Sequence, residues 1–239
     1  MSRVVGLPLS VEERGVIQRC LDRVVEEILL LGLRPELVYD FEEFAAVRGS
    51  VVPPWVYPSF DPRLSELHSD AHWIRVANQF GDTLGMLASR VFRTADFYEL
   101  MRDETLWFRD PPPGAGKRCV VSGENLPRIS GVVAHAGALW VHPSWRKRGL
   151  STLIPLFNRA MLLRNFAIDH QTALVFEGMA ASGLPRNGYG FPRVEKVIEG
   201  FFPPTGKAEC VYLCEINRAE ILERMRRVLA PEATVDAAD

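Results

Sequence analysis

Apolar residues recur at helical and strand spacing along most of the 239-residue chain. Near the start, an apolar series at three- and four-residue intervals follows Ser10 and Glu13, which form a capping-box pair, and predicts a helix over residues 11–31. Residues 36–48 are assigned to a second short helix. The segment 51–62 is rich in proline and aromatic residues and predicts a covering loop, whose aromatic side chains either line a substrate pocket or pack on the core.

Strand-like patterns fill the middle of the chain. Residues 72–79 and 83–92 predict a hairpin, and the next strand is expected at 132–141. Between them, residues 94–131 form an insertion with a helix expected around 96–101. This insertion either helps to set substrate choice or is an extended surface loop.

A helix, a strand and a short helix follow. The apolar stripe from Leu150 to Leu163 predicts a helix, which Pro155 is expected to bend because proline removes a helix hydrogen bond. Residues 172–176 predict a buried strand, and 180–186 a short helix or turn.

The chain then predicts a hairpin of residues 194–202 and 208–216. Asn217 and Glu220 have capping-box spacing before a last helix. The tail at 231–239 is expected to be flexible.

Composition removes several classes of function. A formal net charge of -2 provides no electrostatic footprint for nucleic acid, and no apolar run approaches the roughly 20 residues that span a membrane. The N-terminal apolar stretch is too short for a secretory signal. A cytoplasmic protein is therefore expected.

The cysteines and histidines do not predict a metal site. The four cysteines are too few and too irregularly spaced for a disulfide framework. Cys210 and Cys214 would lie about 13 Å apart on one strand, too far to share an ion. His68 and His72 have the spacing of a helical metal pair but precede a strand without a third ligand nearby, so surface or capping histidines are expected.

The segment 139–152, LWVHPSWRKRGLST, carries the clearest chemistry, because an apolar strand leads through a basic turn into an apolar helix. Gly149 permits close approach of the backbone to a ligand, and the unpaired N–H groups of the following helix favour an anion. The spacing of glycines and lysine excludes a Walker loop and a Rossmann fingerprint. The alternative is a solvated basic turn.

The pattern Arg146-x-x-Gly149-x-Ser151 after a strand resembles the pyrophosphate loop of the GNAT acyltransferase superfamily, with Ser151 in place of the usual small apolar residue. Gly190-Phe191 is similar to a Gly-Phe pair of that family. The resemblance covers roughly 60% of the chain. It implies an α+β fold with a mixed, mostly antiparallel central sheet and flanking helices, preceded by an N-terminal helical and loop extension.

The resemblance also implies a domain organisation. Residues 1–70 would form a helix and a covering segment packed on the core, 71–230 the acyltransferase core with its insertion at 94–131, and 231–239 a flexible tail.

The implied activity is an acyl-CoA-dependent N-acyltransferase. Its most favoured reaction is direct transfer of acetyl from acetyl-CoA, or of another acyl group, to the amine of a small molecule or peptide, without a metal. The alternative is a non-catalytic acyl-CoA-binding protein. Dimers are frequent in this family, so a homodimer stays open. The implied cofactor-binding residues are Leu139, Trp140, Val141, Arg146, Lys147, Arg148, Gly149, Leu150, Ser151 and Thr152.

The catalytic residues follow from the same resemblance. His135 aligns with a glutamate base of histone-acetylating members, and its ordinary pKa of about 6.5 suits proton abstraction; the alternative is a histidine satisfied between strands. Glu177, after the next strand, is the second candidate base. Many members carry a tyrosine acid four residues before the Gly-Phe pair, where this chain has Arg186. Tyr189 is the substitute candidate for that acid.

Overall fold

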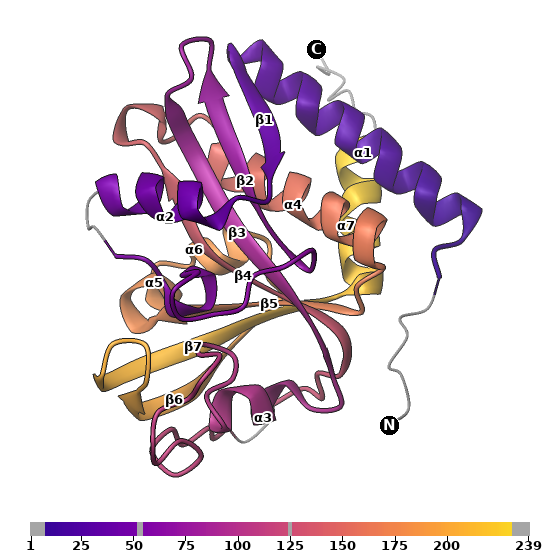
Figure 1. Cartoon of the computed structure of the whole chain (residues 1–239). Helices are drawn as coiled ribbons and strands as arrows, with labels where there is room; N and C mark the ends of the chain where they lie inside the picture. Colours follow the sequence, from indigo (N-terminus) through magenta and orange to yellow (C-terminus); the bar gives the residue numbers. More distant parts are fainter. Residues whose placement is uncertain (1–7, 52–54, 124–125, 231–239) are drawn as a thin grey trace, which may run out of the picture.

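The computed structural model describes residues 8–51, 55–123 and 126–230. Seven strands form one open sheet in the order β1-β2-β3-β4-β5-β7-β6, in which only the β4–β5 pair is parallel (Figure 1). The strands are β1 (Leu33–Val38), β2 (Ala71–Asn78), β3 (Thr83–Thr94), β4 (Gly131–Val141), β5 (His170–Phe176), β6 (Arg193–Phe202) and β7 (Lys207–Asn217).

Helices flank this sheet. They are α1 (Val11–Leu30), α2 (Phe41–Ser50), α3 (Phe97–Arg102), α4 (Leu150–Phe166), α5 (Glu177–Ala181), α6 (Leu184–Asn187) and α7 (Arg218–Leu229), with the 3-10 turns η1 (Pro58–Phe60) and η2 (Pro143–Trp145). This mostly antiparallel open sheet with flanking helices is the predicted α+β fold. None of the described helices combines the length and apolar character needed to cross a membrane.

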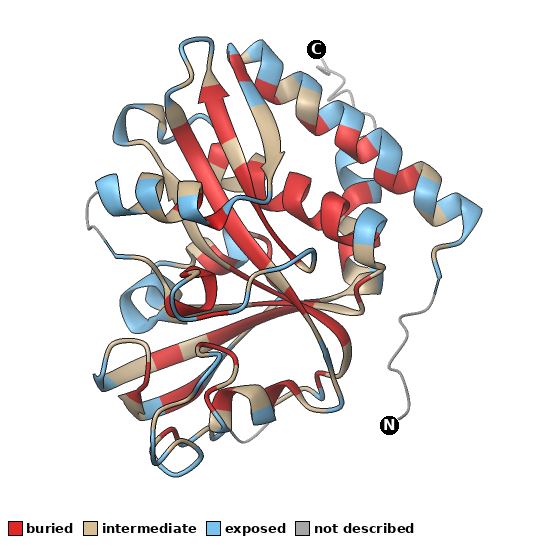
Figure 2. Ribbon diagram, in the orientation of Figure 1, coloured by how far each residue is buried: buried red, intermediate tan, exposed pale blue. Residues whose placement is uncertain are grey.

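One face of the sheet carries α1, α4 and α7, which pack on one another and on the sheet in the largest apolar cluster. Figure 2 shows that α4 is buried along most of its length, whereas α1 exposes its outer side. The predicted capping boxes are present at both ends of the chain, Ser10 with Glu13 on α1 and Asn217 with Glu220 on α7. These caps satisfy N–H groups that begin each helix.

The first strand corrects a sequence prediction. Residues 36–48 were assigned to a helix, but β1 runs to Val38 and pairs with β2, and α2 begins only at Phe41, capped by the Asp40 side chain. Proline within Leu33–Val38 is tolerated because β1 is an edge strand, where a missing N–H costs no ladder bond. That proline and its charged neighbours conceal the strand pattern.

The opposite face of the sheet carries α2, η1 and the insertion between β3 and β4. The insertion is not an extended surface loop, because Leu106 and Trp107 are fully buried in an apolar cluster with β6 and β7. The Ser59 hydroxyl donates to the Leu106 carbonyl at 2.8 Å. An ion pair between buried Glu104 and half-buried Arg118 adds to this packing.

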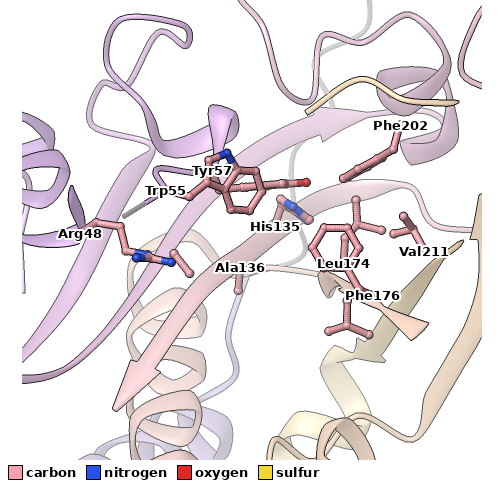
Figure 3. A pocket seen from close by; sticks show the side chains of 12 residues that line it. Arg48, Trp55, Tyr57, His135, Ala136, Leu174, Phe176, Phe202 and Val211 are labelled. Carbon is pink, nitrogen blue, oxygen red and sulfur yellow. The ribbon is translucent and has the colours of Figure 1, made fainter. Parts of the chain in front are cut away.

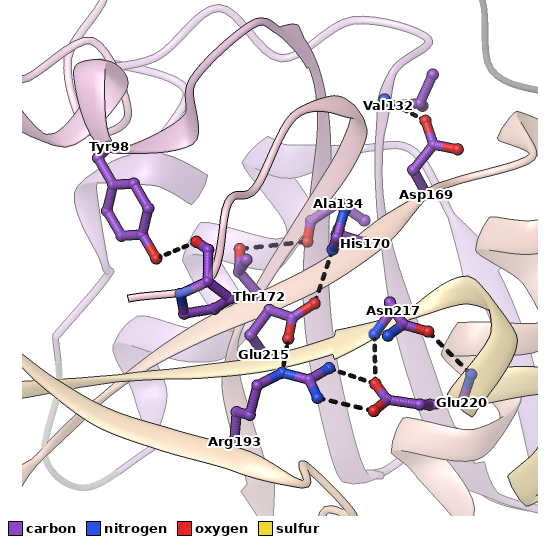
Figure 4. Close-up of polar contacts among 11 residues, drawn as sticks. Tyr98, Val132, Ala134, Asp169, His170, Thr172, Arg193, Glu215, Asn217 and Glu220 are labelled. Carbon is purple, nitrogen blue, oxygen red and sulfur yellow. Dashed lines mark hydrogen bonds and ion pairs between the residues drawn. The ribbon is translucent and has the colours of Figure 1, made fainter. Parts of the chain in front are cut away.

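Ion pairs hold the C-terminal strands and α7 together. Figure 4 shows buried Glu215 accepting from the Nδ1 atom of His170 at 2.7 Å and from Arg193, which also pairs with Glu220 at the start of α7. Because each carboxylate oxygen of Glu215 has a charged or polar hydrogen-bond donor, the cost of burying its charge is offset. The network fixes β5, β6, β7 and α7 relative to one another.

His72 is not the surface or capping histidine that was expected. It lies in β2, fully buried, with Nε2 3.1 Å from the side-chain oxygen of Asn158, which also hydrogen-bonds to Ser89. Burial lowers the pKa of His72 to about 4, so the ring is neutral at physiological pH. Within the described residues, no group of histidine, cysteine and acidic side chains is arranged to hold a metal ion. The predicted flexible tail at 231–239 lies outside these residues.

Candidate active site

The central feature of the site is a split between β4 and β5. The two strands pair from Val133 and His170 to Ala136 and Ala173, and no further pair follows toward the ends of the strands. A register shift between β3 and β4 accompanies the split, and Ala138 has a φ of 55° there. A bulge of this kind bends a strand and ends its pairing. The far half of β4 therefore presents an edge that is not paired with β5.

Two cavities meet at this split. A cavity of about 200 Å³ lies on the α4 face, and its lining includes Leu139, Pro155 and Tyr189. A second cavity of about 100 Å³ lies on the face of α2 and η1 (Figure 3). Both are lined by residues 136–138 of β4 and 174–176 of β5. The two cavities therefore lie on opposite faces of the same short stretches of β4 and β5.

Gly137 is required at the centre of the split. A Cβ atom there would lie 2.7 Å from the ring of buried Phe60, which is below any ordinary contact distance. Phe60 in turn lies parallel to the His135 ring, with their centroids 6.2 Å apart. The absence of a side chain at Gly137 therefore lets Phe60 of η1 pack closely against β4.

The loop after β4 has the backbone features on which the anion site predicted from the sequence depends. Gly149 has a φ of 82° and precedes α4 without a side-chain cap, so N–H groups of the first helical turn have no side-chain partner. Lys147 also has a positive φ, of 62°. The side chains of residues 146–148 are exposed. The structure thus places three cations beside an uncapped helix N-terminus, which together favour a phosphate.

Other predicted loop residues have structural roles. Leu150 is 1% exposed and packs in the core. The Thr152 hydroxyl donates to the carbonyl of Gly188 at 3.2 Å, which ties α4 to the segment after α6. Trp140 faces the α2 side of the sheet, whereas Leu139 lines the larger cavity. Of these four residues, Leu139 is the one that lines a cavity.

His135 lines the smaller cavity and is fully buried. Its Nδ1 atom lies 3.1 Å from the hydroxyl oxygen of Thr172. Figure 4 shows that this hydroxyl also lies within reach of the carbonyl of Ala134, to which it can donate at 3.4 Å. In the tautomer with hydrogen on Nδ1, the hydroxyl accepts from Nδ1–H and the Nε2 lone pair is left free. Nε2 has no hydrogen-bond partner among the described residues.

The pKa of His135 is far below the ordinary histidine value on which its role as a base was expected to rest. Burial, assisted by the nearby charge of Arg90, lowers the pKa of His135 to about 3 rather than leaving it near 6.5. The ring is neutral at physiological pH and is a weak base. It can accept a hydrogen bond through Nε2, but it does not hold a proton taken from an alkylamine.

The other two catalytic candidates lie in different places. Tyr189 lines the larger cavity, with its hydroxyl 3.9 Å from the sulfur of Met179, and burial raises its pKa. Glu177 is exposed at the start of α5 and lines neither cavity. Arg186 donates to the carbonyls of Pro192 and Val194, so it fastens the segment before β6.

The residues missed from the sequence lie mainly on the smaller cavity. Arg48 from α2 and Phe202 from β6 line it together with Tyr57, whose hydroxyl oxygen accepts from the indole N–H of Trp107 at 2.6 Å. The aromatic content of residues 51–62 was the available signal, since Trp55 and Tyr57 do line a pocket. Arg48 has no sequence signal, because its position depends on how α2 packs over β2.

Comparison with known proteins gives a match in structure but not in sequence. No family model and no curated protein matches the chain. Arabidopsis thaliana NAA60 in complex with a bisubstrate analogue superposes with a TM-score of 0.51 at 13% identity, covering 77% of this chain and 97% of that one. NAA60 in complex with acetyl-CoA superposes with a TM-score of 0.49 at 14% sequence identity. That superposition covers 78% of this chain and 99% of NAA60.

A chimera of the Vibrio cholerae spermidine N-acetyltransferase SpeG and hSSAT gives a TM-score of 0.50 at 10% identity, covering 81% of this chain and 99% of the chimera. At such low identities the likeness is one of fold. The resemblance to the GNAT superfamily is therefore confirmed at the level of the fold.

Proposed function

We propose that the protein is an acyl-CoA-dependent N-acyltransferase, which transfers an acyl group, preferably acetyl, to the amine of a small molecule or peptide. One observation carries this proposal: β4 leads from its split with β5 into the basic loop at the uncapped start of α4, and a cavity lies on each side of the split. The acyl donor and the acceptor would approach from opposite faces and meet at residues 136–138.

The chain's own groups fit the parts of an acyl-CoA. Backbone N–H groups of Leu150 and Ser151 would bind the pyrophosphate, with the cations of residues 146–148 around it. Each such charge-assisted hydrogen bond contributes roughly 1.5 to 3 kcal/mol. The pantetheine amides would pair with the edge of β4 at residues 137–141, and the thioester would reach the split beside Tyr189.

The reaction then needs few protein groups. The lone pair of the amine nitrogen attacks the thioester carbonyl carbon; a C–N bond forms, the C–S bond breaks, and sulfur leaves with the electron pair. The Nε2 atom of His135 accepts a hydrogen bond from the amine and orients its lone pair. The amine proton passes to solvent, because His135 is too weak a base to retain it. Tyr189, kept protonated by its raised pKa, donates to the leaving sulfur.

A non-catalytic acyl-CoA-binding protein is the second candidate. Two observations favour it: His135 is a weak base, and the position of the family's tyrosine acid is occupied by Arg186, which holds backbone carbonyls. Both candidates share the cofactor site and differ only in turnover.

The test combines binding and turnover. Calorimetry with coenzyme A measures binding, and a thiol reagent measures free CoA released from acetyl-CoA with a panel of amines. The transferase proposal predicts CoA binding and amine-dependent thiol release. Binding without release for any amine supports the second candidate, and an absence of binding contradicts both.

A further inference from the structure

Gln171 brings a polar side chain into the lining of the larger cavity. It comes from β5, and Tyr189, from the segment after α6, is the other polar side chain of a lining that is otherwise apolar. Gln171 lies two residues before Ala173, which is in the last pair of β4 and β5. Because residues two apart in a strand face the same side of the sheet, the amide lies on the face of Ala173, beside the split.

Arg159 sets the orientation of this amide. Arg159 belongs to α4 and is 1% exposed, and its Nε atom donates to the Oε1 atom of Gln171 at 2.7 Å. Because a guanidinium has no acceptor atom, the amide oxygen must face Arg159 and the amide nitrogen is turned away from it. The amide nitrogen of Gln171 has no hydrogen-bond partner within the described part of the chain, so its N–H groups are left for an acceptor in the cavity.

Arg159 also supplies a positive charge that no acid of the described residues neutralises. Its Nη1 and Nη2 atoms are buried without a hydrogen-bond partner, and its guanidinium carbon lies 4.7 Å from the centre of the Phe191 ring. Burial, followed by the charge of Arg224, lowers the pKa of Arg159 to about 9, so the group stays protonated at physiological pH. This buried charge lies one hydrogen bond away from the cavity, where it polarises the Gln171 amide.

An acyl thioester held in this cavity has two atoms that gain negative charge during the reaction, the sulfur and the carbonyl oxygen. The proposed reaction assigns Tyr189 to the sulfur, so Gln171 is the remaining side-chain donor of the lining. As the amine adds to the carbonyl carbon, the carbonyl π electron pair moves onto the oxygen, and it returns when the C–S bond breaks. A donor that is oriented beforehand, beside a buried positive charge, stabilises that oxygen more than it stabilises the neutral thioester.

We propose that Gln171 is a further catalytic residue, whose amide N–H donates to the carbonyl oxygen of the acyl group, and that Arg159 is the positioning residue that turns this donor toward the cavity. The inference rests on the proposed acyl-CoA chemistry of the same site. The competing donors are backbone N–H groups of β4 at residues 136–138, which line the same cavity.

Infrared spectroscopy of bound acetyl-CoA, labelled with carbon-13 at the acetyl carbonyl, detects this hydrogen bond without requiring turnover, because a donor to the oxygen lowers the C=O stretching frequency. The variants are Gln171→Glu and Gln171→Leu, with Gln79→Glu, at an exposed position, as the matched loss of an amide. Gln171→Glu offers Arg159 a carboxylate in place of the amide oxygen, so the contact that holds β5 to α4 is kept while the donor is lost.

Both Gln171 variants are expected to raise the C=O frequency of bound acetyl-CoA above its wild-type value and to leave the Kd for CoA unchanged. Their kcat for release of CoA thiol should fall on the order of 100-fold, as for removal of one donor to a developing oxyanion. Gln79→Glu should behave as the wild type in all three measurements. The thermal unfolding midpoint of Gln171→Glu should be no lower than that of the wild type, which separates the loss of turnover from a loss of fold.

The positioning role is tested by the same spectrum. Arg159→Lys keeps a charged donor for the amide oxygen and should keep the low C=O frequency, whereas Arg159→Met should lose it. A raised frequency in both Arg159 variants, or in neither, would overturn that role.

A wild-type frequency and a wild-type kcat in both Gln171 variants would overturn the inference, assign the oxygen to the backbone of β4, and leave the acyl-CoA site standing. Binding of acetyl-CoA without turnover for any amine would overturn the catalytic role of Gln171. Absence of CoA binding would overturn the proposed function itself, and this inference with it.

Discussion

The Nδ1 atom of His135 lies 3.1 Å from the hydroxyl oxygen of Thr172, whereas the buried Nε2 atom has no hydrogen-bond partner among the described residues. In the tautomer with its hydrogen on Nδ1, the ring donates to this hydroxyl, which can in turn donate to the carbonyl of Ala134. In that tautomer the neutral ring keeps an unpartnered lone pair on Nε2 and can act as a hydrogen-bond acceptor.

The pH profile of turnover tests the protonation of His135. Because burial lowers its pKa to about 3, the ring does not titrate between pH 5 and 9. We expect kcat/KM to show no inflection near pH 6.5 and to rise with pH until the acceptor amine is deprotonated. Initial rates with two acceptors of different amine pKa check this, since the inflection should move with the acceptor. An inflection near 6.5 that is common to both would restore the general-base role.

Substitution of His135 tests its hydrogen bond. His135→Gln retains a side-chain acceptor and is expected to keep more activity than His135→Leu, which removes it; the leucine variant should lose roughly 10- to 100-fold in kcat/KM, as for loss of one hydrogen bond at a reacting group. CoA affinity should be unchanged in both, because His135 lies on the other cavity. Equal turnover in both variants and in the wild type would show that His135 takes no part in the reaction.

Stability in acid tests the buried histidine of β2. The pKa of His72 is lowered to about 4, so between pH 6.5 and 4 the unfolded chain binds more protons than the folded chain. The free energy of unfolding should therefore fall by up to about 1.4 kcal/mol per pH unit on this account as pH decreases through that window. Above pH 6.5 the contribution of His72 to the free energy of unfolding does not change with pH.

Urea titrations of the wild type and His72→Gln at pH 7, 6, 5 and 4 measure this slope. The variant keeps a polar group beside Asn158 and should show a shallower decline. Parallel curves for the two proteins would show that His72 does not control acid stability.

Much of the fold could be predicted from local pattern. The hairpin of β2 and β3 and the two capping boxes depend on residues adjacent in sequence, and the structure has them where they were expected. The β1 strand could not be predicted, because Pro35 and the charges beside it mimic a loop and only pairing with β2 makes them a strand. Burial of His72 was hidden for the same reason: its partner Asn158 is 86 positions away.

The candidate site, like the fold, has features that depend on local sequence and features that depend on distant segments. The loop around Gly149 is local, and its positive φ and the uncapped start of α4 agree with the sequence pattern, whereas its binding role stays a prediction. The pKa of His135 depends on burial under Phe60 and Tyr57, which come from a distant segment, so the expected value near 6.5 was wrong. Arg48 was missed because nothing in its sequence neighbourhood marks it as a cavity residue.

Tyr189→Phe tests the acid role of the tyrosine. Removal of the hydroxyl should lower kcat about tenfold or more, and leave CoA affinity unchanged, because the larger cavity keeps its shape. The effect should shrink with a thioester whose thiol is a better leaving group. Tyr39→Phe, at an exposed tyrosine, is the matched control and should behave as the wild type. An unchanged kcat in Tyr189→Phe would show that the thiolate leaves without an acid.

Gly149→Val tests the backbone of the anion site. Valine at a φ of 82° is strained by more than about 1 kcal/mol, so the loop and the first turn of α4 should shift. We expect the Kd for CoA to rise at least about tenfold in calorimetry. Gly206→Val, in the turn between β6 and β7 with a φ of 68°, imposes a similar strain away from the site and should leave the Kd unchanged. Equal Kd values for all three proteins would contradict the loop's role.

The most direct measurement is a crystal structure of the protein with coenzyme A. We predict that the pyrophosphate oxygens lie within hydrogen-bond distance of the N–H groups of Leu150 and Ser151, that the pantetheine amides pair with the edge of β4 at residues 137–141, and that the sulfur lies beside Tyr189 at the split. Coenzyme A bound elsewhere, or bound with its phosphates away from the start of α4, would contradict the proposal that this chain uses its split sheet to hold an acyl-CoA.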